Sequence, residues 1–182
     1  MDKFKVNQTQ IVLKQADITK ETCDGIVNAA NSSLMGGGGV DGAIHSAGGP
    51  DILKECKEIR KRQGKLPTGK AVLTTAGKLN AAGVIHTVGP VWNGGNNDEE
   101  QLLKDAYKNS LIVGEENSYN SICFPSISTG AYRFPIEKAA EIALKTIKDY
   151  VLENEQYDEI RMILFSENDY NIYLKKAKNI FK

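Results

Sequence analysis

Short apolar runs typical of β-strands alternate along the chain with longer stretches whose apolar residues recur at helical spacing. The strand-like runs cover residues 4–8, 11–16, 25–30, 70–76, 83–89 and 160–165, and a further one begins at residue 121. The helical stretches cover residues 40–47, 51–62 and 98–117, another follows Pro135, and the last buries Tyr173, Leu174, Ala177 and Ile180. This alternation predicts an α/β sandwich with a mostly parallel sheet, and 182 residues favour one domain over residues 1–182.

Three loops with polar or glycine-rich sequences each follow a predicted strand, after Ala16, after Ala30 and after Pro125. Parallel α/β sheets bind their ligands in a crevice outside the carboxyl ends of the strands. We therefore expect the three loops to converge on one crevice, although they are far apart in the sequence.

Charge and membrane signals exclude several classes of partner. The chain carries 23 basic and 23 acidic residues, so its formal net charge is zero. Without an overall positive field, a nucleic-acid partner is disfavoured, and an anionic ligand must be held by local backbone geometry. The start of the chain resembles neither a signal peptide nor a membrane anchor, and no later apolar run approaches the length of a membrane span.

The cysteines and histidines give no metal signature. Cys23, Cys56 and Cys123 are odd in number and widely spaced, which argues against a disulfide framework and favours a reducing compartment. No cysteine pair has the spacing of metal ligands, and the chain has only two histidines, so we expect no structural zinc site. These features predict a cytoplasmic protein.

Four consecutive glycines, Gly36–Gly39, are followed two residues later by the carboxylate of Asp41. Glycine-rich backbone attracts phosphate through its N–H groups, whereas a carboxylate repels it. At about 5 Å and an effective dielectric of about 20, that repulsion is roughly 3 kcal/mol. Asp41 must therefore lie away from any phosphate bound there, or be hydrogen-bonded strongly enough to tolerate it.

Two nucleotide-binding motifs match only in part. Residues 64–71 approach a P-loop, but Ala71 replaces its hydroxyl and a strand follows where a helix is required, so a turn is favoured. Gly37, Gly39 and Gly42 match the dinucleotide fingerprint, but residues 31–35 separate them from the preceding strand. A dinucleotide oxidoreductase is therefore disfavoured.

Six motifs occur in order over nearly the whole chain: ADIT (16–19), VNAAN (27–31), GGGGVDGAIH (36–45), PTG (67–69), VIHTVGP (84–90) and SISTGAYRFP (126–135). Together they resemble the macro domains, specifically the bacterial O-acetyl-ADP-ribose deacetylases of the MacroD type. The resemblance implies a three-layer α/β/α sandwich with a mixed, mostly parallel central sheet, which binds ADP-ribose at its carboxyl edge. It also implies a hydrolase that uses no metal or cofactor and acts on O-acetyl-ADP-ribose or on mono-ADP-ribosylated proteins.

The resemblance assigns three residues to the adenine. Asp17 would accept a hydrogen bond from the exocyclic amine, Ile18 would contact the base through its backbone, and Phe165 would stack on the ring. Local sequence also allows Asp17 to be only a turn or helix cap and Phe165 to be only a core residue. Stacking of this kind contributes about 1–3 kcal/mol per base.

The diphosphate and the distal ribose are assigned to two loops of small residues. By resemblance, backbone N–H groups grip the diphosphate from both sides, and Tyr132 covers the distal ribose. The residues so assigned are Gly37, Gly38, Gly39 and Val40 in one loop, and Ser128, Thr129, Gly130 and Ala131 in the other.

The resemblance places Asn31 on the distal ribose and makes Asp41 the activator of the attacking water, a task that the substrate's own phosphate would share in some members. Locally, Asp41 is also explained as a first-turn acid of a helix, and Asn31 as a turn cap. Asn28 is interpreted as loop scaffold, His45 as a hydrogen-bonded residue packed under the glycine loop, and His86 as a core residue.

Two further functions stay open: an ADP-ribose reader that binds without cleaving, and a regulatory module that acts through a partner. Arg133 stands where relatives of this type usually have glycine, whose backbone freedom the loop would use. Arg133 would therefore reshape the loop, reach a phosphate or point to solvent.

Overall fold

The computed structural model describes residues 1–182. Seven strands form one mixed sheet. Its strands are β1 (Asp2–Val6), β2 (Thr9–Gln15), β3 (Gly25–Ala30), β4 (Ala71–Thr74), β5 (Gly83–Val88), β6 (Ser121–Phe124) and β7 (Glu159–Leu164). Their order across the sheet is β1-β2-β7-β6-β3-β5-β4. The five central strands are parallel, and only β1 and β4, at the two edges, pair antiparallel with their neighbours.

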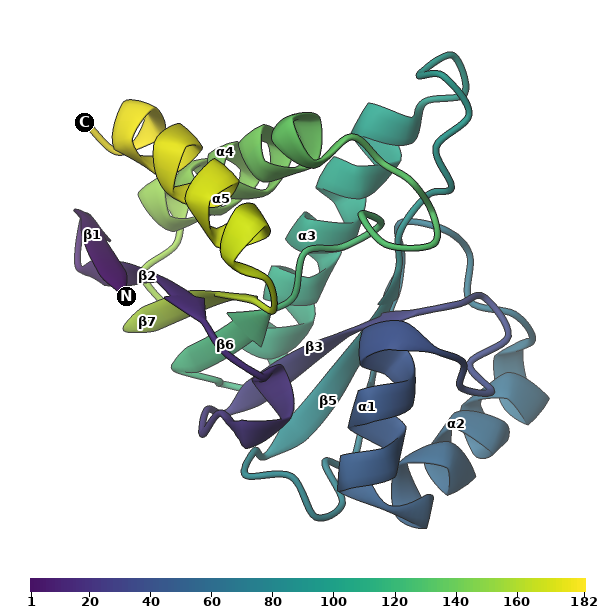
Figure 1. Cartoon of the computed structure of the whole chain (residues 1–182). Helices are drawn as coiled ribbons and strands as arrows, with labels where there is room; N and C mark the ends of the chain where they lie inside the picture. The colour runs from purple at the N-terminus through teal and green to yellow at the C-terminus, as the bar shows by residue number, and fades with distance from the viewer.

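Two helical layers cover the sheet. Helices α1 (Gly39–Gly48) and α2 (Pro50–Gln63) lie on one face, and α3 (Glu99–Glu116), α4 (Ile136–Glu153) and α5 (Glu167–Ile180) lie on the other. Figure 1 shows the sheet between these layers, with a short 3-10 helix, η1 (Ile18–Lys20), after β2. The predicted three-layer α/β/α sandwich is confirmed. None of the helices combines the length and the apolar character that a membrane span requires.

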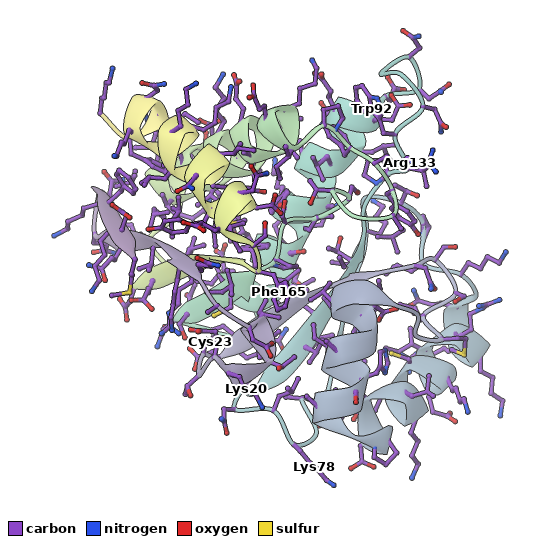
Figure 2. The ribbon with its side chains drawn as sticks, viewed as in Figure 1. Lys20, Cys23, Lys78, Trp92, Arg133 and Phe165 are labelled. Carbon is purple, nitrogen blue, oxygen red and sulfur yellow. The ribbon has the colours of Figure 1, made fainter.

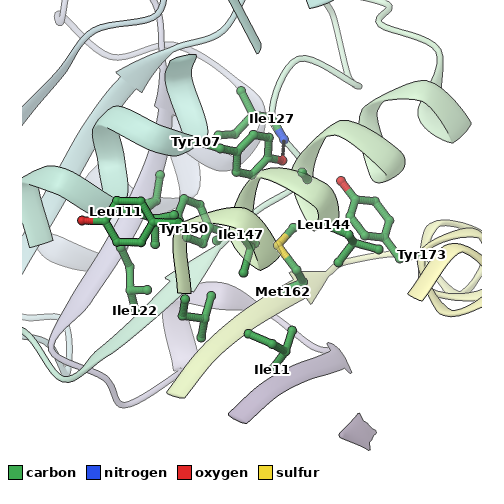
Figure 3. Packing of buried hydrophobic residues seen from close by; sticks show 14 of the residues in the cluster. Ile11, Tyr107, Leu111, Ile122, Ile127, Leu144, Ile147, Tyr150, Met162 and Tyr173 are labelled. Atoms are coloured by element: carbon green, nitrogen blue, oxygen red, sulfur yellow. Dashed lines mark hydrogen bonds between the residues drawn. The ribbon is translucent and has the colours of Figure 1, made fainter. Parts of the chain in front are cut away.

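The layers arise because successive side chains of a strand point to opposite faces of the sheet. In β3, Val27 packs with α3 and α4, whereas its neighbour Ile26 packs with α1 and α2. In β7, Met162 and Ile163 divide in the same way. Figure 3 shows the larger of the two cores, in which Leu144 and other helical side chains pack against the strands.

Several details differ from the sequence prediction: the strand expected over residues 70–76 is β4, which spans only Ala71–Thr74, and η1 was not expected. The strand expected over residues 4–8 is β1, which ends at Val6, because Asn7 has φ +51° and begins a two-residue turn into β2. Asparagine tolerates this left-handed conformation better than most residues. In α5, Tyr173 and Ala177 are buried as expected, but Leu174 and Ile180 are only half-buried.

Candidate functional site

The carboxyl ends of the five parallel strands border one cleft of about 790 Å³. The cleft brings together the loops after β2, β3 and β6, as the strand-end argument predicts. Every residue that the sequence analysis assigned to the site lines it: Asp17, Ile18, Asn31, Gly37, Gly38, Gly39, Val40, Asp41, Ser128, Thr129, Gly130, Ala131, Tyr132 and Phe165. The structure therefore brings all the candidate residues to one place.

Asp17 lies at one end of the cleft and caps η1. Its Oδ1 accepts hydrogen bonds from the backbone N–H of Thr19 at 2.9 Å and from the Thr19 hydroxyl at 2.7 Å. These two hydrogen bonds lower the pKa of Asp17, with the hydroxyl contributing most. The cap interpretation is thus confirmed, and Oδ2 has no hydrogen bond to the protein, so it is available to a ligand.

Phe165 directly follows β7 at the rim of the cleft, near Asp17 and Ile18. Its side chain is 83% exposed, which rules out the alternative that it is a core residue. Figure 2 shows Phe165 near the middle of the view, whereas Trp92 and Arg133 lie at its upper right. A phenyl ring in this position offers a free face to a planar ligand.

The first loop bends closely over the start of α1. Asn31 holds it by donating from Nδ2 to the Gly36 carbonyl at 2.9 Å and by accepting from the Ser33 N–H at 3.1 Å. A Cβ on Gly38 or Gly39 would meet no atom within 4 Å, so this backbone borders open space. The first N–H groups of α1 have no partner within the helix. This end of the helix can therefore bind an anion.

Asp41 sits in the first turn of α1 and is 5% exposed. Its Oδ1 accepts a hydrogen bond from Asn28 Nδ2 at 2.8 Å and lies 3.3 Å from His45 Nε2. Its Oδ2 faces the loop: a Cβ on Gly37 would lie 3.3 Å from Asp41 Oδ2 and 3.4 Å from Asn31 Nδ2. One oxygen is therefore held by the protein, while the other has no protein hydrogen bond and borders the cleft.

Asn28 and His86 form a buried polar pair behind Asp41. The interpretation of Asn28 as loop scaffold is wrong: it lies within β3, fully buried, directly opposite His86 of β5 in the parallel register. Asn28 Nδ2 also lies 3.1 Å from His86 Nδ1. Asn28 Oδ1 has no partner, which for a buried carbonyl costs about 1–3 kcal/mol.

His45 lies beside this pair, with its ring centroid 6.1 Å from that of His86. His45 packs under the glycine loop as expected, because a Cβ on Gly36 would lie 3.8 Å from its ring. His86 is a core residue, also as expected, and burial together with the nearby His45 lowers its pKa to about 3. His86 is therefore neutral at physiological pH.

Cys56 joins the histidines in a cluster whose potential metal-ligand atoms all lie within 4.8 Å of one another. Sequence spacing could not reveal the cluster, since its members come from α1, α2 and β5. Burial, with the charges of Asp41 and Glu55, raises the pKa of the Cys56 thiol to about 11. Both ring nitrogens of His86 are used in hydrogen bonds, Nδ1 with Asn28 and Nε2 with Thr74, and these contacts fix the orientation of its imidazole.

Two buried tyrosines fix the second loop. Tyr107 of α3 accepts a hydrogen bond from the Ile127 N–H at 3.1 Å and donates to the Pro125 carbonyl at 3.3 Å; Figure 3 shows the first of these bonds. Tyr173 of α5 shares a hydrogen bond of 2.8 Å with Ser126. A Cβ on Gly130 would meet no atom within 4 Å, so this loop also presents open backbone to the cleft.

Arg133 resolves the three alternatives raised by the sequence. It is exposed, its side chain makes no hydrogen bond, and it does not line the cleft, so it points to solvent. Its φ of +59° lies in the left-handed region, where glycine is preferred. Backbone hydrogen bonds hold the loop in this conformation: the Tyr132 carbonyl accepts from the Trp92 N–H at 2.8 Å, and the Gly130 carbonyl accepts from the Arg133 N–H at 3.0 Å.

Sequence reasoning missed several residues that line the cleft. Gly89 follows β5, and a Cβ there would lie 2.0 Å from Ser128 Oγ, so only glycine fits between the strand end and the second loop. Asp169 in the first turn of α5 lines the end that holds Phe165. Gly89 could have been found from its place after a predicted strand, whereas no local signal marks Asp169.

Comparisons with known proteins agree with this geometry. A profile of the Macro domain matches residues 27–143. A macro domain-containing protein of Caldanaerobacter subterraneus subsp. tengcongensis is 54% identical over 173 residues, covering 95% of this chain and 98% of that protein. An O-acetyl-ADP-ribose deacetylase of Escherichia coli K12 is 52% identical over 166 residues, covering 91% and 94%.

Solved structures give the same result. A macrodomain of Oceanobacillus iheyensis with ADP has a TM-score of 0.95 and 47% identity, covering 98% of this chain and 95% of that one. A macrodomain of Trypanosoma brucei in complex with ADP-ribose has a TM-score of 0.83 and 37% identity, covering 91% and 68%. The chain belongs to the macro domain family.

Proposed function

We propose that this protein is a metal-independent hydrolase of ADP-ribose derivatives, which removes the acetyl group from O-acetyl-ADP-ribose or ADP-ribose from acidic side chains. The observation that carries the proposal is the carboxylate of Asp41, with one oxygen held by Asn28 and the other bordering the cleft. A reader that only binds ADP-ribose would not need a carboxylate so arranged.

The proposed binding mode follows the chemistry of the cleft. The adenine stacks on Phe165, and its amine donates to the free oxygen of Asp17. The diphosphate lies between the open backbone at Gly38 and at Gly130. The distal ribose then lies beside Asn31, where Tyr132 covers it, and this position separates Asp41 from the phosphates.

The proposed reaction requires one water molecule between Asp41 Oδ2 and the distal ribose. Asp41 accepts a proton from this water, whose oxygen attacks the acetyl carbonyl. The bond between that carbonyl carbon and the ribose oxygen breaks, and the ribose oxygen recovers the proton. The products are acetate and ADP-ribose, and the binding of adenine and diphosphate holds the reacting groups in place.

Turnover of O-acetyl-ADP-ribose, and of a protein carrying glutamate-linked mono-ADP-ribose, tests the proposal. We expect product release that persists in the presence of a metal chelator. Tight ADP-ribose binding in calorimetry without product from either substrate would contradict the hydrolase and favour the reader.

A cytoplasmic location and mono-ADP-ribosylated protein substrates belong to the same proposal. The three free cysteines support a reducing compartment, since all three are buried and unpaired. Recovery of the enzyme from a fractionated cell would test the location directly.

A further inference from the structure

A chain of hydrogen bonds runs from Asp41 back through the sheet to the backbone beyond β4. Asp41 Oδ1 accepts from Asn28, which contacts His86 Nδ1 at 3.1 Å, and His86 Nε2 lies 2.8 Å from the hydroxyl of Thr74. That hydroxyl lies 3.0 Å from the Thr75 carbonyl. Asn28 and His86 are fully buried and Thr74 is 3% exposed, so water does not compete for these contacts.

The carbonyl at the far end fixes the direction of every donor in the chain. A carbonyl only accepts, so the single hydroxyl proton of Thr74 is used by Thr75. Thr74 Oγ1 therefore accepts from His86, and the imidazole proton is on Nε2. Because His86 is neutral, its Nδ1 carries a lone pair and accepts from Asn28.

The orientation of the Asn28 amide follows from that lone pair. Its two N–H groups match two acceptors, Asp41 Oδ1 and His86 Nδ1. A flipped amide would set its oxygen against both acceptors. The observed orientation leaves Asn28 Oδ1 buried without a hydrogen-bond partner. The amide orientation is therefore stabilised by the two acceptors of its N–H groups, because its own carbonyl gains no hydrogen bond.

We propose that His86 is a positioning residue for catalysis: its Nε2–H tautomer, set by Thr74, orients Asn28 so that Asp41 presents Oδ2 to the reacting water. The proposal rests on the hydrolase function proposed above. His86 does not touch the cleft and acts only through Asn28. With this tautomer, Asn28 holds Asp41 Oδ1, so the oxygen left free is Oδ2, which lies beside Gly37 and Asn31.

The tautomer can be measured in the wild-type protein without any substrate. In ¹⁵N-labelled protein at neutral pH, we expect His86 to show an unprotonated Nδ1 and a protonated Nε2, with cross-peaks typical of that tautomer. A protonated Nδ1 would overturn the proposal, because Asn28 could not then donate to it. This result stands whether or not the protein turns out to be a hydrolase.

Three variants test the link to catalysis. His86→Leu removes the acceptor, and we expect kcat to fall by about 10- to 100-fold, the range that small misplacement of a reacting group produces. ADP-ribose affinity should stay within about twofold of wild type, because the cleft lining is unchanged. His86→Asn returns an acceptor oxygen near the position of Nδ1, so we expect it to recover most of kcat.

Cys56→Ala is the matched control: Cys56 Sγ lies 3.8 Å from His86 Nε2 but makes no hydrogen bond to Asn28 or Asp41, and in the variant Thr74 still accepts from Nε2 at 2.8 Å. We expect its kcat to match wild type. Wild-type kcat in His86→Leu would overturn the proposal, and so would equal losses in folded His86→Asn and His86→Leu. If His86→Leu does not fold, His86→Asn with the labelled wild-type protein decides. Inactive wild type that shows the expected tautomer would instead contradict the hydrolase function.

Discussion

The two ends of the cleft are built in opposite ways. At the end with Phe165 and Asp17, the side chains that would contact a ligand are exposed, and Phe165 makes no core contact. At the end with Asp41, the carboxylate is 5% exposed and is held by a fully buried asparagine. The first end offers contact area, whereas the second offers fixed geometry.

This difference assigns affinity and chemistry to different residues. An exposed aromatic ring gains binding energy by stacking, and small errors in its position matter little. A general base must lie within hydrogen-bond reach of the proton that it accepts, so its position has to be set before the substrate arrives. Changes at the exposed end should therefore alter binding, and changes at the buried end should alter turnover.

The largest effect is expected for Asp41→Asn. Its Oδ1 can still accept from Asn28, so the fold is kept while the negative charge is lost. We expect kcat to fall about 10²–10⁴-fold, the usual contribution of a general base, with ADP-ribose affinity equal or higher because repulsion of the phosphates decreases. A kcat near that of wild type would leave activation of the water to the substrate's phosphate.

Phe165→Ala tests the exposed end. We expect the Kd for ADP-ribose to rise by about 5- to 150-fold, equivalent to the loss of about 1–3 kcal/mol of stacking. At saturating substrate kcat should change little. Calorimetry with steady-state kinetics measures both quantities, and a fall in kcat without a change in Kd would contradict the division between the two ends.

The free energy of unfolding should depend on pH through two groups whose pKa values the fold lowers, His86 behind the buried end and Asp17 at the exposed end. The pKa of His86 is lowered from 6.5 to about 3, so in acid only the unfolded chain binds this proton. Between pH 6.5 and about 5, the free energy of unfolding should therefore fall by about 1 kcal/mol per pH unit on account of His86. Asp17, whose pKa is also lowered, acts only in stronger acid.

Urea unfolding at about pH 7.5 and about pH 5.5 measures this dependence. His86→Leu should show a smaller loss of stability between the two conditions than wild type. Equal losses in the two proteins would mean that His86 is not held neutral by the fold.

Asp17→Asn should weaken binding without destabilising the protein. Asparagine caps a helix as well as aspartate does, but it places an amide N–H₂ where the free carboxylate oxygen lies. We expect ADP-ribose affinity to fall about fivefold, equivalent to about 1 kcal/mol for an exposed charged hydrogen bond. Asp17→Ala is the control, which should lose the cap as well, and equal melting temperatures for the two variants would be inconsistent with the capping role.

The smallest effect is expected for Arg133→Gly. Relief of the left-handed backbone at φ +59° should stabilise the protein by up to about 1 kcal/mol. ADP-ribose affinity should not change, because Arg133 does not line the cleft. A lower affinity in this variant would show that Arg133 reaches a bound phosphate.

The exposed end could be predicted from the sequence and the buried end only in part. Strand and helix periodicity located the loops, and the rule for parallel sheets brought them together at one edge. The resemblance named Phe165 and Asp41. The hydrogen-bond chain behind Asp41 was missed because Asn28 and His86 meet through the pairing of β3 with β5, which no spacing in the sequence encodes.

The conformations of the Arg133 loop and of the turn at Asn7 also could not be predicted from the sequence. The sequence showed that Arg133 replaces a usual glycine, but its side chain had three possible destinations. Only the structure shows that it points to solvent, because Arg133 is exposed and does not line the cleft. The break between the first two strands was expected at residues 9–10 but lies at residues 7–8, because the four polar residues between Val6 and Ile11 do not show which pair forms the turn.

A crystal structure with ADP-ribose bound would show the ligand and the reacting water together. We expect adenine on Phe165, diphosphate between the two open loops, and an ordered water within hydrogen-bond distance of Asp41 Oδ2 and next to the distal ribose. A ligand bound in the opposite direction, or an Asp41 that turns Oδ2 away from the ribose, would contradict this expectation.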